Sequence, residues 1–89
     1  MPTDAIPPPY RGPTQGVARV EIEGATVEAC LRSVGDLYPG FIEQIFDARG
    51  AVHRFVKLFI NGDEIDRAAI DTRVAADDEV EILAAVAGG

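Results

Sequence analysis

The chain is poor in several residue types, and each shortage argues against a class of function. Its one cysteine, Cys30, cannot form an internal disulfide. Lys and Arg together number 8 against 15 Asp and Glu, which gives a formal net charge of −7. Nucleic acids and anionic membranes are bound by clustered positive charge, so we expect neither as a partner. No apolar run approaches the roughly 20 residues needed to span a bilayer.

The length and the N-terminus set the remaining limits. A chain of 89 residues that is 47% hydrophobic is expected to form one folded domain with a modest core. The opening residues, MPTDAIPPPY, lack the basic region and apolar core of a secretory signal, so we expect a cytoplasmic location. Arginine occurs seven times, whereas Lys57 is the single lysine.

The first half of the chain predicts two strands and a helix. Residues 1–16 are rich in Pro and Gly, with a strand expected at Thr3–Ile6, before the proline triplet. Residues 17–23 alternate apolar and charged, as half-buried strands do. Thr26 is a suitable helix N-cap. The apolar residues that follow it form one helical stripe: Val27, Cys30, Leu31, Val34, Leu37 and Tyr38.

The second half predicts a short helix and a hairpin. Residues 52–60, VHRFVKLFI, are rich in β-branched and aromatic residues and predict a strand. Asn61-Gly62 is typical of a type I′ hairpin turn, which places Ile65 on a short return strand. Before this hairpin, a short helix is expected to bury one apolar face: Phe41, Ile42, Ile45 and Phe46.

The final segment completes an α+β fold. Residues 66–78 are expected to be mostly loop, anchored by Ile70 and Val74, and residues 79–83 alternate as a last strand. One main helix packed on one face of a small mixed sheet is a stable two-layer arrangement. We therefore predict a domain over residues 1–83, followed by a flexible, extended tail over residues 84–89.

The C-terminal sequence resembles that of the MoaD/ThiS sulfur carriers, bacterial relatives of ubiquitin that have the β-grasp fold. The resemblance is carried by the turn at Asp77-Asp78, the strand EVEIL and the ending AAVAGG. HRFVKLFING and AIPPPYRGPTQG are similar to the branch of the family that serves cysteine biosynthesis in actinobacteria, although the proline triplet departs from the pattern.

This resemblance implies a mechanism in which the chain is a carrier and not an enzyme. An E1-like enzyme would use ATP to adenylate the carboxylate of Gly89, and a sulfur donor would convert it to a thiocarboxylate. A downstream enzyme would then accept the sulfur. Val86, Ala87 and Gly88 would thread the activating enzyme's channel. The chain itself would bind no cofactor or metal, and it would be monomeric when free of its partners.

The chemistry of the ending is consistent with this mechanism. An α-carboxylate has a pKa of about 3.5 and is an unreactive anion at neutral pH, so it must be activated before a nucleophile can attack it. Two terminal glycines remove the side chains that would obstruct a narrow channel. A thiocarboxylate would then be a soft sulfur nucleophile. Taken alone, a C-terminal Gly-Gly also fits simple fraying.

Several other residues have less specific interpretations. Cys30 lies on the apolar helix stripe, so we favour inert core over a sulfur relay. His53 has no accompanying ligands at metal-site spacing and is expected to be a surface or packing residue. The acidic runs at residues 63–66 and 77–79 lack the spacing of a calcium loop and are expected to be solvated turns.

Outward-facing residues of the last strands form a candidate docking surface. Val56, Leu58 and Ile60 should meet the helix, which leaves Phe55 and Phe59 on the opposite face. Leu83 is expected to point the same way. Either these three residues dock a partner beside the tail, or the two phenylalanines pack under the second helix or a loop.

Three functional hypotheses follow. The first is a sulfur carrier, in cysteine biosynthesis or, alternatively, as the molybdopterin-synthase small subunit or the thiamine carrier. The second is a ubiquitin-like protein modifier joined to lysines of target proteins. The third is a binding module whose tail has no role.

Overall fold

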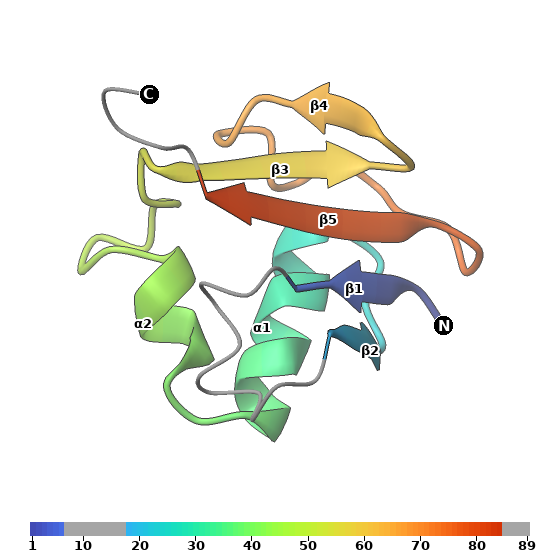
Figure 1. Ribbon diagram of the computed structural model, residues 1–89, viewed down its shortest axis with the longest axis horizontal. Helices are drawn as coiled ribbons and strands as arrows, with labels where there is room; N and C mark the ends of the chain where they lie inside the picture. Colours follow the sequence, from blue (N-terminus) through green and yellow to red (C-terminus); the bar gives the residue numbers. More distant parts are fainter. Residues whose placement is uncertain (7–17, 85–89) are drawn as a thin grey trace.

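Residues 1–6 and 18–84 form, in a computed structural model, a mixed five-stranded sheet with two helices on one face (Figure 1). The strand order is β2-β1-β5-β3-β4, with β1 and β5 parallel at the centre and every other neighbouring pair antiparallel. This is the α+β arrangement predicted from the sequence. The elements are β1 (Thr3–Ala5), β2 (Arg19–Glu21), α1 (Val27–Leu37), α2 (Phe41–Ile45), β3 (Val56–Ile60), β4 (Asp63–Ile65) and β5 (Glu79–Ala84).

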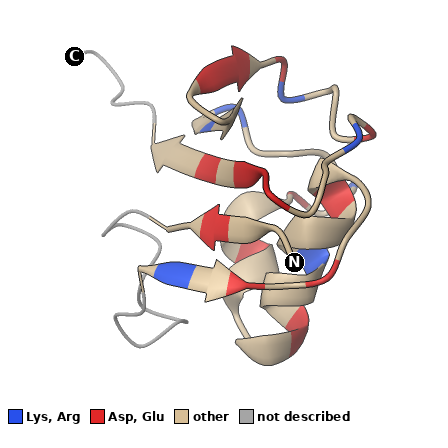
Figure 2. Ribbon diagram, turned by 90° about the vertical axis from the view of Figure 1, so that its right-hand side faces the viewer, with Lys and Arg blue, Asp and Glu red and all other residues tan. Residues whose placement is uncertain are grey.

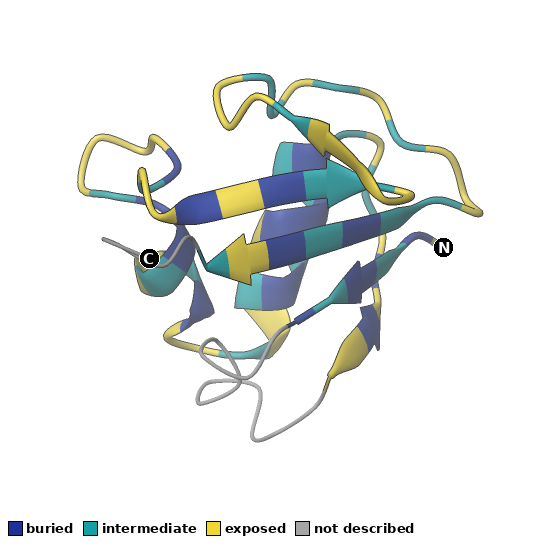
Figure 3. Cartoon of the chain, turned by 45° about the horizontal axis from the view of Figure 1, so that its top comes forward, coloured by how far each residue is buried: buried dark blue, intermediate teal, exposed yellow. Residues whose placement is uncertain are grey.

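The core lies between the sheet and the helices. Buried and exposed residues alternate along β3 and β5, as Figure 3 shows, because successive strand side chains point to opposite faces. Each fully buried aliphatic side chain contributes roughly 1.5–3 kcal/mol relative to exposure. The side chains with no exposed surface include Val27, Leu31 and Val34 of α1 and Leu58, Val80 and Ile82 of the sheet.

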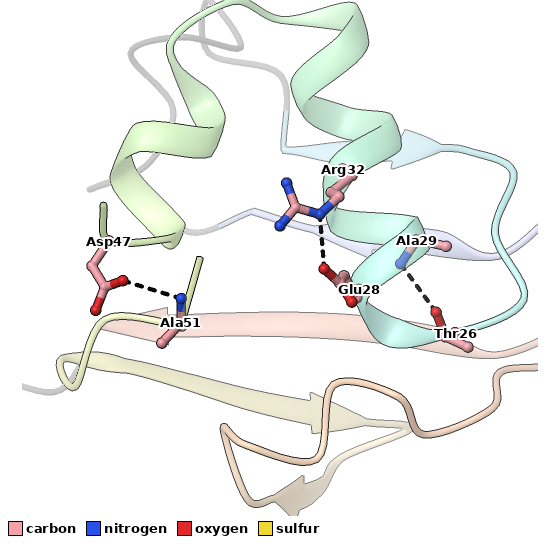
Figure 4. A network of polar contacts seen from close by, with 6 residues as sticks. All are labelled: Thr26, Glu28, Ala29, Arg32, Asp47 and Ala51. Carbon is pink, nitrogen blue, oxygen red and sulfur yellow. Dashed lines mark hydrogen bonds and ion pairs between the residues drawn. The ribbon is translucent and has the colours of Figure 1, made fainter. Parts of the chain in front are cut away.

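Helix α1 begins as its sequence predicts. The Ala29 N–H donates to Thr26 Oγ1 at 3.1 Å, which caps the first turn. Arg32 pairs with Glu28 one turn earlier, and both contacts are drawn in Figure 4. Later in the helix, a Cβ on Gly35 would lie 2.2 Å from Ile42 Cγ1, so the close approach of α2 requires glycine at this position.

The hairpin between β3 and β4 is confirmed. Asn61 and Gly62 have φ of 52° and 87°, the positive values that a type I′ turn needs at both central positions. The Asn61 side chain donates to Asp78 Oδ1 at 2.8 Å and accepts from the Glu79 N–H at 2.9 Å. These contacts tie the hairpin to the start of β5.

Some predicted boundaries are wrong. The strand expected over residues 52–60 begins only at Val56, because the Val56 N–H donates to the His53 carbonyl in a turn, at 3.0 Å. Of the strand expected over residues 17–23, residue 17 lies outside the described residues, and within 18–23 the strand is formed by Arg19–Glu21. Ala84, expected to begin the tail, is the last residue of β5 and pairs with Val56.

The end of the helical stripe also differs from the prediction. Leu37 was expected to face the core, yet it is 59% exposed. Tyr38 is half-buried and lies just beyond the helix as its C-cap. The first four members of the stripe are buried and Tyr38 packs against the core from its edge, so Leu37 is the member that does not face the core.

Candidate functional site

The site is built around the point where the tail leaves the sheet. Ala84 ends β5 opposite Val56, the first residue of β3, so the tail begins at this end of the sheet. The predicted sulfur-carrying residue Gly89 and the threading residues Val86, Ala87 and Gly88 lie outside the described residues. Their roles remain predictions, and the structure supplies the geometry of the surface from which they start.

Four outward-facing residues extend from this point along β3 and β5, and we call them the tail-root face: Phe55, Lys57, Phe59 and Leu83. Lys57 and Leu83 are directly opposite each other in the β3–β5 pair, and Phe59 is one pleat further along the same face. Leu83 is 39% exposed, Phe55 is 46% exposed, and Phe59 is half-buried. The structure thus brings the predicted docking residues to one face of the β3–β5 pair, with Phe55 and Leu83 near Ala84 and Phe59 further along β3.

The exposure of Phe55 and Phe59 tests the alternative that they pack under α2 or a loop. Phe55 lies just before β3 and carries the Arg54 guanidinium 4.9 Å from its ring centroid. A core position under α2 is therefore wrong for Phe55. Phe59 keeps some contact with its neighbours but points away from the buried face occupied by Val56 and Leu58. Docking by these residues stays a prediction.

Carboxylates flank the apolar part of the tail-root face. In the strand register, Phe59 is opposite Glu64 on one side and Glu81 on the other. Neither glutamate forms an ion pair within residues 1–6 and 18–84. Figure 2 shows acidic residues distributed over the strands and helices of this view. The site therefore offers an aromatic and aliphatic centre with an acidic border, which suits a partner surface with apolar and basic residues.

Cys30 and His53 are the other side chains that could support chemistry, and both lie among structural contacts. Cys30 has no exposed surface, and burial followed by the charge of Asp4 raises the pKa of its thiol to about 11. Both features favour the inert core position over a sulfur relay. His53 Nε2 lies 3.3 Å from the Glu43 carbonyl oxygen. The described residues contain no group of three or more His, Cys, Asp or Glu side chains placed to hold a metal ion.

Sequence reasoning missed one unusual residue, Asp4. Its carboxyl group has no exposed surface, and neither oxygen has a hydrogen-bond partner in the described part of the chain. Burial raises its pKa from 3.8 to about 7. The signal was available, because Asp4 shares a strand face with Ile6, and Ile6 is buried.

Comparison with known proteins identifies the family. The model of the ThiS family matches residues 11–89. The chain belongs to the ThiS family. Mycobacterium tuberculosis has a relative named sulfur carrier protein CysO, which is 34% identical over 90 residues, covering 98% of this chain and 97% of the relative.

Solved structures agree with this assignment. A complex of BexX and CysO from Amycolatopsis orientalis contains a chain that matches with a TM-score of 0.87 and 31% identity, covering 100% of both chains. Small archaeal modifier protein 1 from Methanosarcina acetivorans matches with a TM-score of 0.82 and 25% identity over 99% of this chain and 95% of that one. This ThiS-family chain therefore has the ubiquitin-like β-grasp fold. Neither helix in its described part has the length and apolar content to cross a bilayer.

Proposed function

We propose that this ThiS-family chain is a sulfur carrier that acts through a thiocarboxylate on Gly89. The observation that carries the proposal is the combination of a Gly-Gly ending with membership of a family whose M. tuberculosis relative is named a sulfur carrier protein. The chain supplies the carboxylate, and partner enzymes supply the acid–base groups, the ATP and the sulfur. It is thus a co-substrate and not an enzyme.

The chemistry of activation proceeds in two steps. The Gly89 carboxylate oxygen attacks the α-phosphorus of ATP, forming an acyl-adenylate and releasing pyrophosphate. A sulfide sulfur then attacks the acyl carbon, and AMP leaves with the electrons of the C–O bond. The product is a thiocarboxylate, whose soft and largely ionised sulfur attacks electrophiles in the accepting enzyme.

The tail-root face is the proposed contact for the activating enzyme. Five residues beyond Ala84 span at most about 17 Å when fully extended, so an enzyme whose ATP site receives Gly89 must approach this end of the sheet. Phe55 and Leu83 supply exposed apolar area at this end, and the half-buried Phe59 extends it along β3. The same face would be available to the downstream enzyme that accepts the sulfur. A partner is consistent with the BexX/CysO complex of the relative.

Cysteine biosynthesis is the favoured destination of the sulfur. HRFVKLFING and AIPPPYRGPTQG are similar to the cysteine-biosynthesis branch, and the M. tuberculosis relative named CysO matches over nearly the whole chain. The molybdopterin-synthase small subunit and the thiamine carrier are the alternatives within the same mechanism. A cytoplasmic location accompanies each of them.

The test is intact-protein mass spectrometry after incubation with an E1-like enzyme, ATP and sulfide. We expect one oxygen of the chain to be replaced by one sulfur, and no change when Gly89 is deleted. A chain extended by one extra glycine is the matched control, because it still ends in Gly-Gly but carries its carboxylate one residue further from the sheet. Circular dichroism of both variants checks that they remain folded. Sulfur acquired equally by the chain lacking Gly89 would contradict the proposal.

A protein modifier is the second candidate, and the likeness to a small archaeal modifier protein favours it. Activation of the carboxylate would be the same, but the acyl group would pass to a lysine amine of a target. With Lys57 as its single lysine, the chain could link to itself at only one position. Conjugates from the native host that survive reducing denaturing gels would support this candidate. Their absence, together with sulfur loading, would exclude it.

A further inference from the structure

Within residues 1–6 and 18–84, the large hydrophobic residues that are exposed fall into two groups. Phe55 and Leu83 belong to the tail-root face, whereas Met1 and Leu37, each 59% exposed, line a separate groove. This groove has a volume of about 250 Å³ and lies between the end of β2 and the last turns of α1. The proposed sulfur chemistry does not account for it.

One wall of the groove is an open strand edge. The Ile22 N–H donates to the Pro2 carbonyl at 3.0 Å, and β2 pairs with β1 in antiparallel register. Because residues of an antiparallel strand alternate in the direction of their backbone groups, the N–H and C=O of Glu21 point away from β1. They have no hydrogen-bond partner within the described residues. An extended peptide laid along this edge can bond to both groups.

The opposite wall is held in place before any ligand binds. Ser33 Oγ, on α1, donates to the Glu23 carbonyl at 2.6 Å and so fixes the helix against the segment after β2. A preformed groove loses less conformational entropy when a ligand binds. The apolar contact within it is Leu37, the residue that the helical stripe wrongly assigned to the core.

The charges of the groove are of one sign. Glu21, Glu23 and Asp36 line it, all three are exposed, and none forms an ion pair within residues 1–6 and 18–84. A second copy of this chain would bring the same carboxylates face to face, and such like-charge contacts are unfavourable. Lys or Arg side chains on a partner would instead complement them.

We propose that this groove binds an extended, basic and apolar segment of a partner protein as an added β-strand on the edge of β2. An apolar residue of the segment contacts Leu37, and flanking Lys or Arg side chains face Glu23 and Asp36. The groove adjoins the start of β1, which pairs with the start of β5, whereas the tail leaves from the end of β5. As Figure 1 shows, the start of β1 and the end of β5 lie at opposite ends of the sheet. Such a partner could therefore hold the chain while the tail-root face is engaged.

The test uses a short blocked peptide in which arginine alternates with valine and isoleucine, titrated into the full chain and followed by backbone amide chemical shifts. We expect shifts at residues 19–23 and 33–37 and protection of the Glu21 amide from hydrogen exchange. Peptides with glutamate in place of arginine, or with a central proline that removes an N–H donor, should not bind. Shifts confined to the tail-root face, or no shifts at all, would overturn the proposal.

Matched variants of the protein test the charges. The double change Glu23→Lys and Asp36→Lys should weaken the peptide's affinity by about tenfold. Asp71→Lys with Asp77→Lys makes the same change in net charge on the exposed loop before β5 and should leave the affinity unchanged. If both pairs of changes weakened the peptide's affinity equally, the effect would be one of net charge alone, and binding in the groove would be refuted.

A further variant and a measurement of mass in solution complete the design. Leu37→Ser removes an exposed side chain, so the fold is retained while peptide binding is lost. If sedimentation showed that the free chain dimerises and that Leu37→Ser makes it monomeric, a second copy would be the occupant and the proposal would be wrong. None of these measurements depends on sulfur loading, so the proposed function stands or fails separately.

Discussion

Asp4 makes the stability of this protein depend on pH in an unusual direction. Its carboxyl is fully buried, has no hydrogen-bond partner in the described part of the chain, and has its pKa raised by desolvation from 3.8 to about 7. The folded state therefore holds a proton that the unfolded state has already lost. Stability from this group is complete below pH 3.8 and is lost as pH rises through 7.

The magnitude follows from the size of the shift. A difference of about 3 pKa units corresponds to roughly 4 kcal/mol at pH values well above 7. Between pH 5 and pH 8, the same linkage predicts a loss of roughly 2–3 kcal/mol in the free energy of unfolding. That is a large part of the stability expected for so small a domain.

The variant Asp4→Asn isolates this effect. Asparagine has nearly the shape of the protonated acid and does not titrate, so the variant should lack this loss and be more stable than the wild type at pH 8. The difference between the two proteins cancels the contributions of other groups. Asp47 and Asp78, for example, have lowered pKa values, chiefly because backbone N–H groups donate to their carboxylates. The stability that they contribute is lost as pH falls, in a range below about pH 5.

The assay is urea denaturation of both proteins at several pH values from 5 to 8. We expect the unfolding free energy of the variant, relative to that of the wild type, to increase as pH rises from 5. The increase should level off as pH passes the raised pKa of Asp4. A wild type and a variant whose stabilities run parallel over this range would refute the reasoning. So would a variant that is less stable at pH 8.

Three further predictions concern docking, the thiol and the helix cap. Phe59→Ser combined with Leu83→Ser should raise the KM of the activating enzyme for the carrier about tenfold, because a docking centre is lost. The control variant Leu37→Ser should leave kcat/KM unchanged. Equal effects of the two variants would show that the tail-root face does not dock the enzyme. Cys30 should resist iodoacetamide at pH 8 in the folded protein and react on unfolding, because its thiol is buried and its pKa is raised to about 11; rapid labelling of the native chain would contradict this placement. Thr26→Ala should lower the unfolding free energy by about 1 kcal/mol, measured by denaturation, and an unchanged midpoint would show that the cap contributes nothing.

Much of the fold could be predicted because local signals and tertiary structure agree. Thr26 caps α1, Asn61-Gly62 forms the expected turn, and Val80 and Ile82 alternate into the core. These features depend on neighbours in sequence, and periodicity reports such neighbours directly.

The remaining features depend on where elements end relative to one another. Leu37 has the spacing of a core residue, but it ends α1 and is exposed. The strand predicted over residues 52–60 starts late because the chain first turns at His53 to enter the sheet. Asp4 was placed correctly on a strand, and its spacing from Ile6 indicated an inward side chain, but the charge of an aspartate argued for an exposed one.

The role of Gly89 can be tested directly against that of Cys30, whose thiol is the alternative position for the transferred sulfur. The chain is incubated with an E1-like enzyme, ATP and isotopically labelled sulfide, and fragmentation mass spectrometry then locates the label. The account predicts the label on the C-terminal peptide, as a thiocarboxylate of Gly89, with Cys30 unlabelled. An unmodified C-terminal carboxylate, with the label anywhere else in the chain, would contradict it.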